Sequence, residues 1–282
     1  MRPERLARVS AALGSEASFV RRLGGGDINQ CGLVETSEGL VFVKWNERPV
    51  PDMFAFEAEG LRALRDTGTL RVPEPFVFGE DFLAMEYLGL PPARRDFGEE
   101  LGRGLAALHR TAAKRFGFHE DNVLAVLPQP NSWIDNWVAF WGHRRLLHFG
   151  RIGLERGQLG AGTFRALETL VARLGELLPA HPVASRLHGD LWSGNVVPAS
   201  DGAPALIDPA VYHGHREVDL AMTELFGGFS PSFYAAYREA WPLEPGWERR
   251  RIVYQLAPLL VHVILFGGPY EAQVATALSR LT

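Results

Sequence analysis

The chain has 282 residues, 46% of them hydrophobic and 22% charged, which is the composition of a globular protein that buries a sizeable core. Its net charge of −4 leaves no basic footprint, so we expect no nucleic-acid partner. The single cysteine, Cys31, excludes an intramolecular disulfide framework and a cysteine-rich zinc site.

Neither end of the chain carries a membrane signal. Residues 1–20 mix charged and small apolar residues, which is typical of a short amphipathic helix and not of a signal peptide. The longest apolar tract, residues 252–266, is short and interrupted by polar residues and a proline, so it predicts a buried helix. We therefore expect a cytoplasmic protein that makes no membrane contact.

Strand patterns dominate the first 90 residues. Runs of β-branched and aromatic residues predict strands at 19–23, 32–36, 41–45, 76–78 and 82–86. One helical pattern, residues 52–65, interrupts them. This order predicts a small N-terminal ATP-binding lobe, residues 1–88, made of an antiparallel sheet and one helix.

The chain becomes mostly helical after Gly89. Helices are predicted at 97–113, 133–149, 163–178, 218–226, 232–241 and 247–266. We expect a hinge near Gly89 and a larger, mainly helical catalytic and substrate-binding lobe over residues 89–282. The predicted fold class is thus α+β, a bilobal fold like that of protein kinases, with the ligand cleft between the lobes.

The strongest chemical signal lies in the second lobe. Residues 188–195 read HGDLWSGN, and residues 205–209 read ALIDP, which places Asp208 after a short apolar strand. Phosphoryl transfer needs a carboxylate aimed at the acceptor hydroxyl and oxygen ligands for magnesium. Asp190 is the candidate for the base, and Asn195 and Asp208 are the candidates for the metal ligands. His188 is expected to brace this segment.

Lys44 is one of only two lysines among the 29 basic residues, so its retention calls for a specific reason. It ends a strand with apolar neighbours, where an ammonium group can reach nucleotide phosphates. Glu57 shares the inward face of the predicted helix and is the expected partner, whereas Glu59 points elsewhere.

Two further segments are candidates for nucleotide contacts. A glycine-rich loop between the first two predicted strands can bring backbone N–H groups to phosphates. Its residues are Gly24, Gly25, Gly26, Asp27 and Asn29. The backbone at the end of the last strand of the first lobe can bind an adenine edge, although packing explains Met85 equally well. These residues are Met85, Glu86, Tyr87 and Leu88.

With these motifs in hand, the chain resembles the fructosamine/ketosamine kinase family, a branch of the aminoglycoside-phosphotransferase-like kinases. The most specific stretches are HGDLWSGN at 188–195 and IDPAVYHGHREVDLAMTELFGGF at 207–229. GGGDIN at 24–29, VFVK at 41–44, FGFH at 116–119 and NSWIDNWVAFWGHRRL at 131–146 support the resemblance.

The resemblance implies an ATP- and Mg²⁺-dependent enzyme that phosphorylates a sugar hydroxyl, typically O3, of a ketosamine, either free or linked to a protein. The product is labile, so the implied role is deglycation repair. Carried over, Asp190 is the base, Trp192 is a wall for the sugar, and Glu217 faces a cationic amine. Asp219 is expected to brace the catalytic loop.

Other functions remain open at this point. Asp208 is followed by Pro209 and Ala210 and not by Phe-Gly, which argues against a protein kinase with an activation loop. A kinase of another small acceptor, such as an aminoglycoside, choline or a simple sugar, shares the same core motifs. A catalytically silent nucleotide-binding module is the alternative from another class. The sequence leaves the oligomeric state undetermined.

Overall fold

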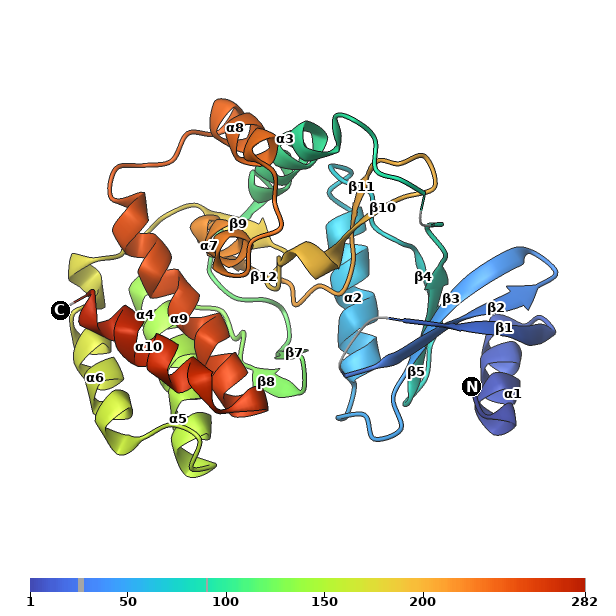
Figure 1. Ribbon diagram of the computed structural model, residues 1–282, viewed down its shortest axis with the longest axis horizontal. Coiled ribbons are helices and arrows are strands. Elements are labelled where there is room, and N and C mark those ends of the chain that lie inside the picture. Colours follow the sequence, from blue (N-terminus) through green and yellow to red (C-terminus); the bar gives the residue numbers. More distant parts are fainter. Residues whose placement is uncertain (25–27, 90, 282) are drawn as a thin grey trace.

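One antiparallel sheet organises the N-terminal part of the molecule (Figure 1, blue to blue-green). The computed structural model describes residues 1–24, 28–89 and 91–281. The strand order is β1-β2-β3-β5-β4, and all neighbouring strands are antiparallel. The strands are β1 (Ala17–Leu23), β2 (Gln30–Thr36), β3 (Gly39–Trp45), β4 (Pro75–Phe78) and β5 (Phe82–Glu86). All five predicted strands are therefore confirmed.

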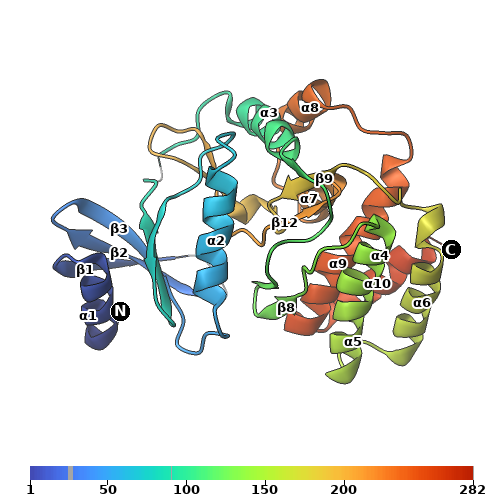
Figure 2. The same cartoon turned by 180° about the vertical axis from the view of Figure 1, so that it is seen from behind.

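Two helices accompany this sheet. Helix α1 (Pro3–Leu13) lies against β1 and β4, and Arg5 on it pairs with Glu47 at 2.8 Å and with Asp81 at 2.7 Å. Helix α2 (Met53–Arg65) stands between the sheet and the rest of the molecule (Figures 1 and 2). The sequence predicted one helix in this lobe, and the structure has two. The additional helix is α1, the amphipathic start of the chain, which also packs on the sheet.

The rest of the chain is mostly helical, and its helices lie on the far side of α2 from the sheet (Figure 1). Its helices are α3 (Phe97–His109), α4 (Trp137–Trp141), α5 (Leu147–Glu155), α6 (Ala161–Ala172), α7 (Glu217–Leu225), α8 (Pro231–Ala240), α9 (Trp247–Phe266) and α10 (Pro269–Ser279). The α+β, kinase-like fold class predicted from the sequence is confirmed. We propose that the lobe boundary lies where predicted, between residues 88 and 89.

Short strands in this part position the connecting segments. Strands β12 (Tyr212–Gly214), β9 (Ala184–Leu187) and β6 (Ala112–Ala113) form one small sheet in that order. Two hairpin ladders pair β10 (Val196–Pro198) with β11 (Pro204–Leu206) and β7 (Asn122–Leu124) with β8 (Leu127–Gln129). Of these, only β11 was predicted, as the short apolar strand before Asp208. The others have two to four residues, which is too few for a detectable alternation.

Three predicted helices differ clearly from the observed bounds, and one of them, expected over 163–178, ends at Ala172. The helix expected over 97–113 ends at His109, because the following residues pair as β6 with β9. The helix expected over 133–149 begins at Trp137, where the Asn136 side chain accepts the N–H of Ala139 at 2.9 Å and caps the first turn. A π-helical stretch, Gly142–Leu146, then separates α4 from α5.

Helix α10 was also missed. It follows Gly267 and Gly268, whose φ angles of 62° and 56° suit glycine, and it starts with Pro269. The glycine pair lets the chain reverse, so that α10 packs back against α9. In the part of the chain that the structure describes, no helix is both long and apolar enough to cross a membrane.

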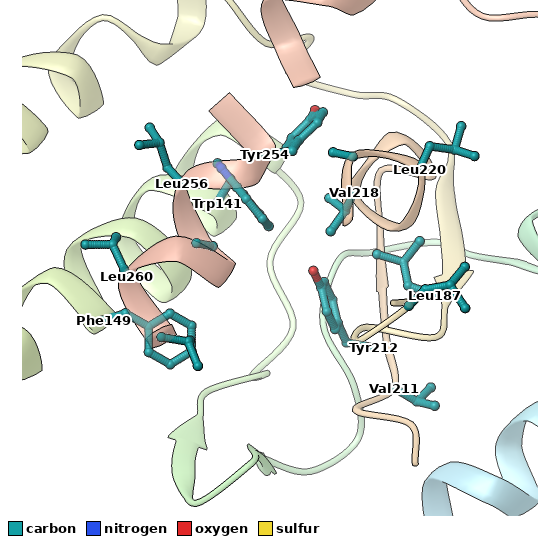
Figure 3. Close-up of a cluster of buried hydrophobic side chains, with 14 of the residues drawn as sticks. Trp141, Phe149, Leu187, Val211, Tyr212, Val218, Leu220, Tyr254, Leu256 and Leu260 are labelled. Carbon is teal, nitrogen blue, oxygen red and sulfur yellow. The ribbon is translucent and has the colours of Figure 1, made fainter. Parts of the chain in front are cut away.

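The largest hydrophobic core lies behind residues 188–195, the segment that carries Asp190 and follows β9. Figure 3 shows Tyr254 and Trp141 from α9 and α4 facing the strand side, where Tyr212 and Leu187 lie. The rings of Trp141 and Tyr254 lie 5.1 Å apart between centroids, and Trp137 donates its indole N–H to the Tyr254 hydroxyl at 3.0 Å. Because β9 leads directly into residue 188, and Leu187 and Leu191 belong to this core, the core anchors the segment 188–195.

Gly102 supports the contact between α3 and α8. A Cβ added there would lie 2.4 Å from the carbonyl oxygen of Phe233 and 2.9 Å from the nitrogen of Tyr237. We expect Gly102→Ala to lower the free energy of unfolding by about 1–3 kcal/mol, because the two helices must separate. Gly162→Ala on α6 is the control, since nothing lies within 4 Å of its added Cβ. Urea unfolding of both variants measures the difference, and equal stabilities would contradict this packing.

Candidate active site

The segment 188–195 connects β9 to β10 and brings Asp190 into the cleft. Its sharp turn depends on Gly189, which has a φ of 84°. A Cβ at that position would lie 2.0 Å from the carbonyl oxygen of Ala210. Only glycine fits there, so the His-Gly-Asp order has a steric reason.

Two side chains brace this turn. Asp219 on α7 accepts the backbone N–H groups of His188 at 2.7 Å and Gly189 at 3.0 Å. The His188 ring accepts the N–H of Asp190 through Nδ1 at 3.2 Å, so its Nε2 carries the proton and donates to the carbonyl of Ile207 at 2.9 Å. The bracing predicted for His188 and Asp219 is confirmed.

Three oxygen-bearing side chains meet beside this turn. Asn195 donates through Nδ2 to the backbone oxygen of Asp190 at 2.8 Å and to its Oδ2 at 3.1 Å. Asp208, in the left-handed region with a φ of 54°, lines the same cavity. Burial raises the pKa of Asp190 to about 7, and the charge of Asp208 adds to the shift. The carboxyl group is thereby placed near the pKa that suits a general base at neutral pH.

Lys44 joins the sheet to the catalytic side of the cleft. Its Nζ lies 2.8 Å from Oε1 of Glu57 on α2 and 2.6 Å from Oδ1 of Asp208. Burial by itself lowers the pKa of Lys44, but the charges of Asp208 and Glu57 outweigh it and the net shift is upward. The predicted pair of Lys44 and Glu57 is therefore present, and Asp208 completes a three-member ion cluster.

A single cavity of about 1150 Å³ contains all these groups. Gly24 and Asn29 from the predicted glycine-rich loop line it, whereas Gly25, Gly26 and Asp27 lie outside the described residues. The predicted adenine-side residues Met85, Glu86, Tyr87 and Leu88 line it as well. The cleft therefore runs from the end of β5 past Lys44 to Asp190 and Trp192.

Glu217 does not belong to this site, so its predicted contact with a substrate amine is wrong. Its side chain is fully buried at the start of α7, and both oxygens accept hydrogen bonds from Arg250 at 2.7 Å. The resemblance to the ketosamine kinase family had implied that this carboxylate faces a substrate amine, which requires an accessible side chain. The helix turns this side chain toward α9, and it pairs in the core.

The sequence did not indicate the far wall of the cleft. That wall comes from α7, α9 and α10, and it carries Met222, Phe226, His262, Phe266 and Tyr270. No motif or metal-ligand spacing in the sequence marks His262 as a cleft residue. The one usable signal was a pair of aromatic residues, Phe266 and Tyr270, that flank Gly267 and Gly268. Their spacing in the sequence did not show that they line a cleft.

A carboxylate on a braced loop, a second carboxylate and an amide beside it, and a lysine ion pair across the cleft define a phosphotransferase of the kinase-like class. The family to which the chain belongs follows from its similarity to known proteins. Over residues 3–282 the chain matches the family model described as fructosamine kinase. The chain belongs to the fructosamine kinase family.

Individual relatives span nearly the whole chain. A probable ketoamine kinase of Synechocystis is 40% identical over 266 residues, which cover 92% of this chain and 89% of the relative. A chloroplastic protein-ribulosamine 3-kinase of Arabidopsis thaliana is 37% identical over 267 residues, which cover 92% and 81%. The crystal structure of a provisionally assigned fructosamine-3-kinase from Thermobifida fusca has a TM-score of 0.88 at 35% identity, with 98% of both chains covered.

More distant structures share the fold alone. A thermostable aminoglycoside phosphotransferase in complex with ADP and hygromycin B has a TM-score of 0.66 at 13% identity, with 98% of this chain covered. The predicted relation to aminoglycoside-phosphotransferase-like kinases is therefore confirmed at the level of the fold.

The buried pair of Glu217 and Arg250 yields a stability prediction. We expect Glu217→Ala to lower the free energy of unfolding by about 3–5 kcal/mol, because it leaves the guanidinium of Arg250 without its partner in the core. Glu176→Ala is the matched control, since Glu176 pairs with Arg173 on the open surface and its loss should leave the melting temperature unchanged. Thermal and urea unfolding measure both. A Glu217→Ala protein as stable as the wild type, but with a changed acceptor preference, would restore the substrate role.

Proposed function

We propose that the protein is an ATP- and Mg²⁺-dependent kinase that phosphorylates a sugar hydroxyl, O3, of a ketosamine. The observation that carries the proposal is the meeting of Asp190, Asn195, Asp208 and Lys44 in one cleft. The names of the relatives support the acceptor class, since they include ketoamine kinases and protein-ribulosamine 3-kinases. The phosphorylated product releases its amine, so the proposed role is deglycation repair of metabolites or of proteins. The proposed location is the cytoplasm.

The residues present fit magnesium. Asp208 offers a carboxylate and Asn195 an amide oxygen, and Mg²⁺ prefers oxygen ligands, commonly one or two from the protein together with phosphates. Among the described residues, no group of three or more His, Cys, Asp and Glu side chains could hold a metal ion alone. The site therefore suits an ion that binds jointly with a nucleotide, where it would neutralise charge on the transferred phosphoryl group.

The side chains of the cleft divide the remaining work. Lys44, kept charged by Glu57, is placed to contact the phosphates. Asp190 orients the acceptor hydroxyl and takes its proton. A bond then forms between that oxygen and the γ-phosphorus, the bond from the γ-phosphorus to the bridging oxygen breaks, and ADP leaves with the electron pair.

Trp192 is the proposed wall for the sugar. It follows Asp190 by two residues, lines the cleft and remains 41% exposed. A Cβ at Gly194 would lie 2.1 Å from the indole ring, so glycine lets the ring lie across the turn. One face of a sugar is apolar C–H, which stacks on an aromatic surface.

The acceptor class is tested by measuring ADP release with Mg²⁺ and ATP over fructosyl-, ribulosyl- and erythrulosyl-lysine, with an aminoglycoside and choline as controls. We expect turnover of at least one ketosamine, with phosphorus NMR placing the phosphate on O3. Turnover of a control acceptor alone would keep the kinase chemistry and overturn the ketosamine assignment.

The role of Asp190 is tested by Asp190→Asn. We expect kcat to fall by about 10²- to 10⁴-fold, because base and aiming functions act in the transition state, while the Kd for ATP measured by calorimetry changes little. Asp201→Asn, on an exposed turn, should keep full activity and serves as the control. An Asp190→Asn enzyme as active as the wild type would mean that another group acts as the base.

A further inference from the structure

The far wall of the cleft is apolar and rich in aromatic residues. Phe226 at the end of α7, His262 and Phe266 on α9, and Tyr270 on α10 line the same cavity as Asp190. The ring of His262 lies at the centre of this group, with centroid distances of 4.7 Å to Phe226, 5.0 Å to Tyr270 and 5.5 Å to Phe266. We call these four residues the aromatic wall.

The chain places the aromatic wall beside the catalytic segment. The reversal at Gly267 and Gly268 brings Tyr270 on α10 back toward the end of α9, where Phe266 lies (Figure 1). On the other side, a Cβ at Gly228, two residues after Phe226, would lie 2.6 Å from the Cβ of Ser193. The end of α7 therefore packs on the loop that carries Asp190.

These rings are open to the cleft. Phe226 is 40% exposed and Phe266 is 53% exposed. Nine large hydrophobic side chains are exposed in the described part of the chain, and four of them, including Trp192 and Ile28, line this cavity. Exposed apolar groups that gather in a concave site mark a ligand contact.

The carboxylates of the cleft are already engaged. Four of them line it in the described part of the chain: Glu57, Glu86, Asp190 and Asp208. Glu57 and Asp208 share the ammonium group of Lys44, and Glu86 pairs with Arg71. Asp190 is the proposed base, and Glu217 is buried against Arg250. A cationic group on the acceptor therefore has to find another partner.

His262 offers such a cationic group a hydrogen-bond acceptor atom. Its Nδ1 lies 2.8 Å from the carbonyl oxygen of Pro258, which can only accept, so Nδ1 carries the proton. Burial lowers the pKa of His262, which favours the neutral ring. The unprotonated Nε2 is then a hydrogen-bond acceptor among aromatic rings, whose faces attract cations.

We propose that the aromatic wall binds the protonated secondary amine of the ketosamine, through cation–π contact with its rings and an N–H hydrogen bond to Nε2 of His262. The proposal rests on the proposed function, because it names how that site recognises its acceptor. It makes the wall the element that distinguishes an amine-linked sugar from a free or ether-linked sugar.

The test compares two acceptors that share a sugar and differ in one atom. Both are built on the sugar of the ketosamine that turns over fastest in the panel. One is its 1-(n-butylamino)-1-deoxyketose, and the other is the 1-O-n-butyl ether of the same ketose. Phe226→Leu, Phe266→Leu and Tyr270→Leu remove the ring face and keep apolar bulk. Phe76→Leu on β4 is the control, since it is equally exposed but does not line the cleft.

We expect the wild type to prefer the amine. Each variant of the aromatic wall should lower kcat/KM for the amine by about 2- to 30-fold and leave the ether nearly unchanged, so that the preference shrinks. The KM for ATP and the melting temperature should stay at wild-type values, as should all constants of Phe76→Leu.

Each other outcome overturns the proposal in a distinguishable way. A wild type that turns over no ketosamine refutes the proposed function, and the wall's role with it. A wild type that turns over the amine, with wall variants that leave its kcat/KM unchanged, refutes the wall alone. An equal loss for the amine and the ether shows an apolar subsite without recognition of charge, which also refutes it.

Discussion

The architecture depends on one buried positive charge. The ammonium group of Lys44 sits on β3, yet its two partners come from α2 and from the segment after β11, and its side chain is only 7% exposed. Removing a charge from water is costly unless it is paired, so the sheet, the helix and the catalytic side of the cleft are held in one arrangement. The same ion cluster places Lys44, the cation proposed to contact phosphates, beside Asp208, the carboxylate proposed to hold the metal. The ion cluster of Lys44, Glu57 and Asp208 therefore serves both the packing of the lobes and the proposed chemistry.

A second device holds the catalytic turn from behind. Asp219 accepts two consecutive backbone N–H groups of the turn, and His109 on α3 lies 3.1 Å from the same carboxylate. His109 in turn contacts the hydroxyl of Tyr237 on α8 at 2.8 Å. Buried polar networks are rigid only when their members are satisfied, and here three helices supply the partners. Asp190 is thus positioned by hydrogen bonds from behind the turn, while the turn itself requires glycine at position 189.

The two halves of the cleft differ in chemistry. The side formed by the sheet and the catalytic segment contains its charges, including Lys44 and Asp190, whereas the wall formed by α7, α9 and α10 is aromatic. The charged half suits phosphoryl transfer, which is common to kinases of many acceptors. The aromatic half is where a choice between acceptors can be made without disturbing that machinery. Under our proposal, the double-glycine turn before α10 contributes to acceptor specificity as well as to the packing of α10 on α9.

The sequence by itself determined the fold class, the five strands of the sheet and the group of Lys44, Glu57, Asp190, Asn195 and Asp208. These follow from local patterns, because strand alternation, helix periodicity and the spacing within 188–195 each depend on nearby residues. Only the tertiary structure decided that Glu217 faces Arg250 and that His262 and Tyr270 line the cleft. Those outcomes depend on which face each helix presents after packing, and on the reversal at Gly267 and Gly268. Contacts between residues far apart in the chain are set by packing of the whole molecule, and no local pattern encodes them.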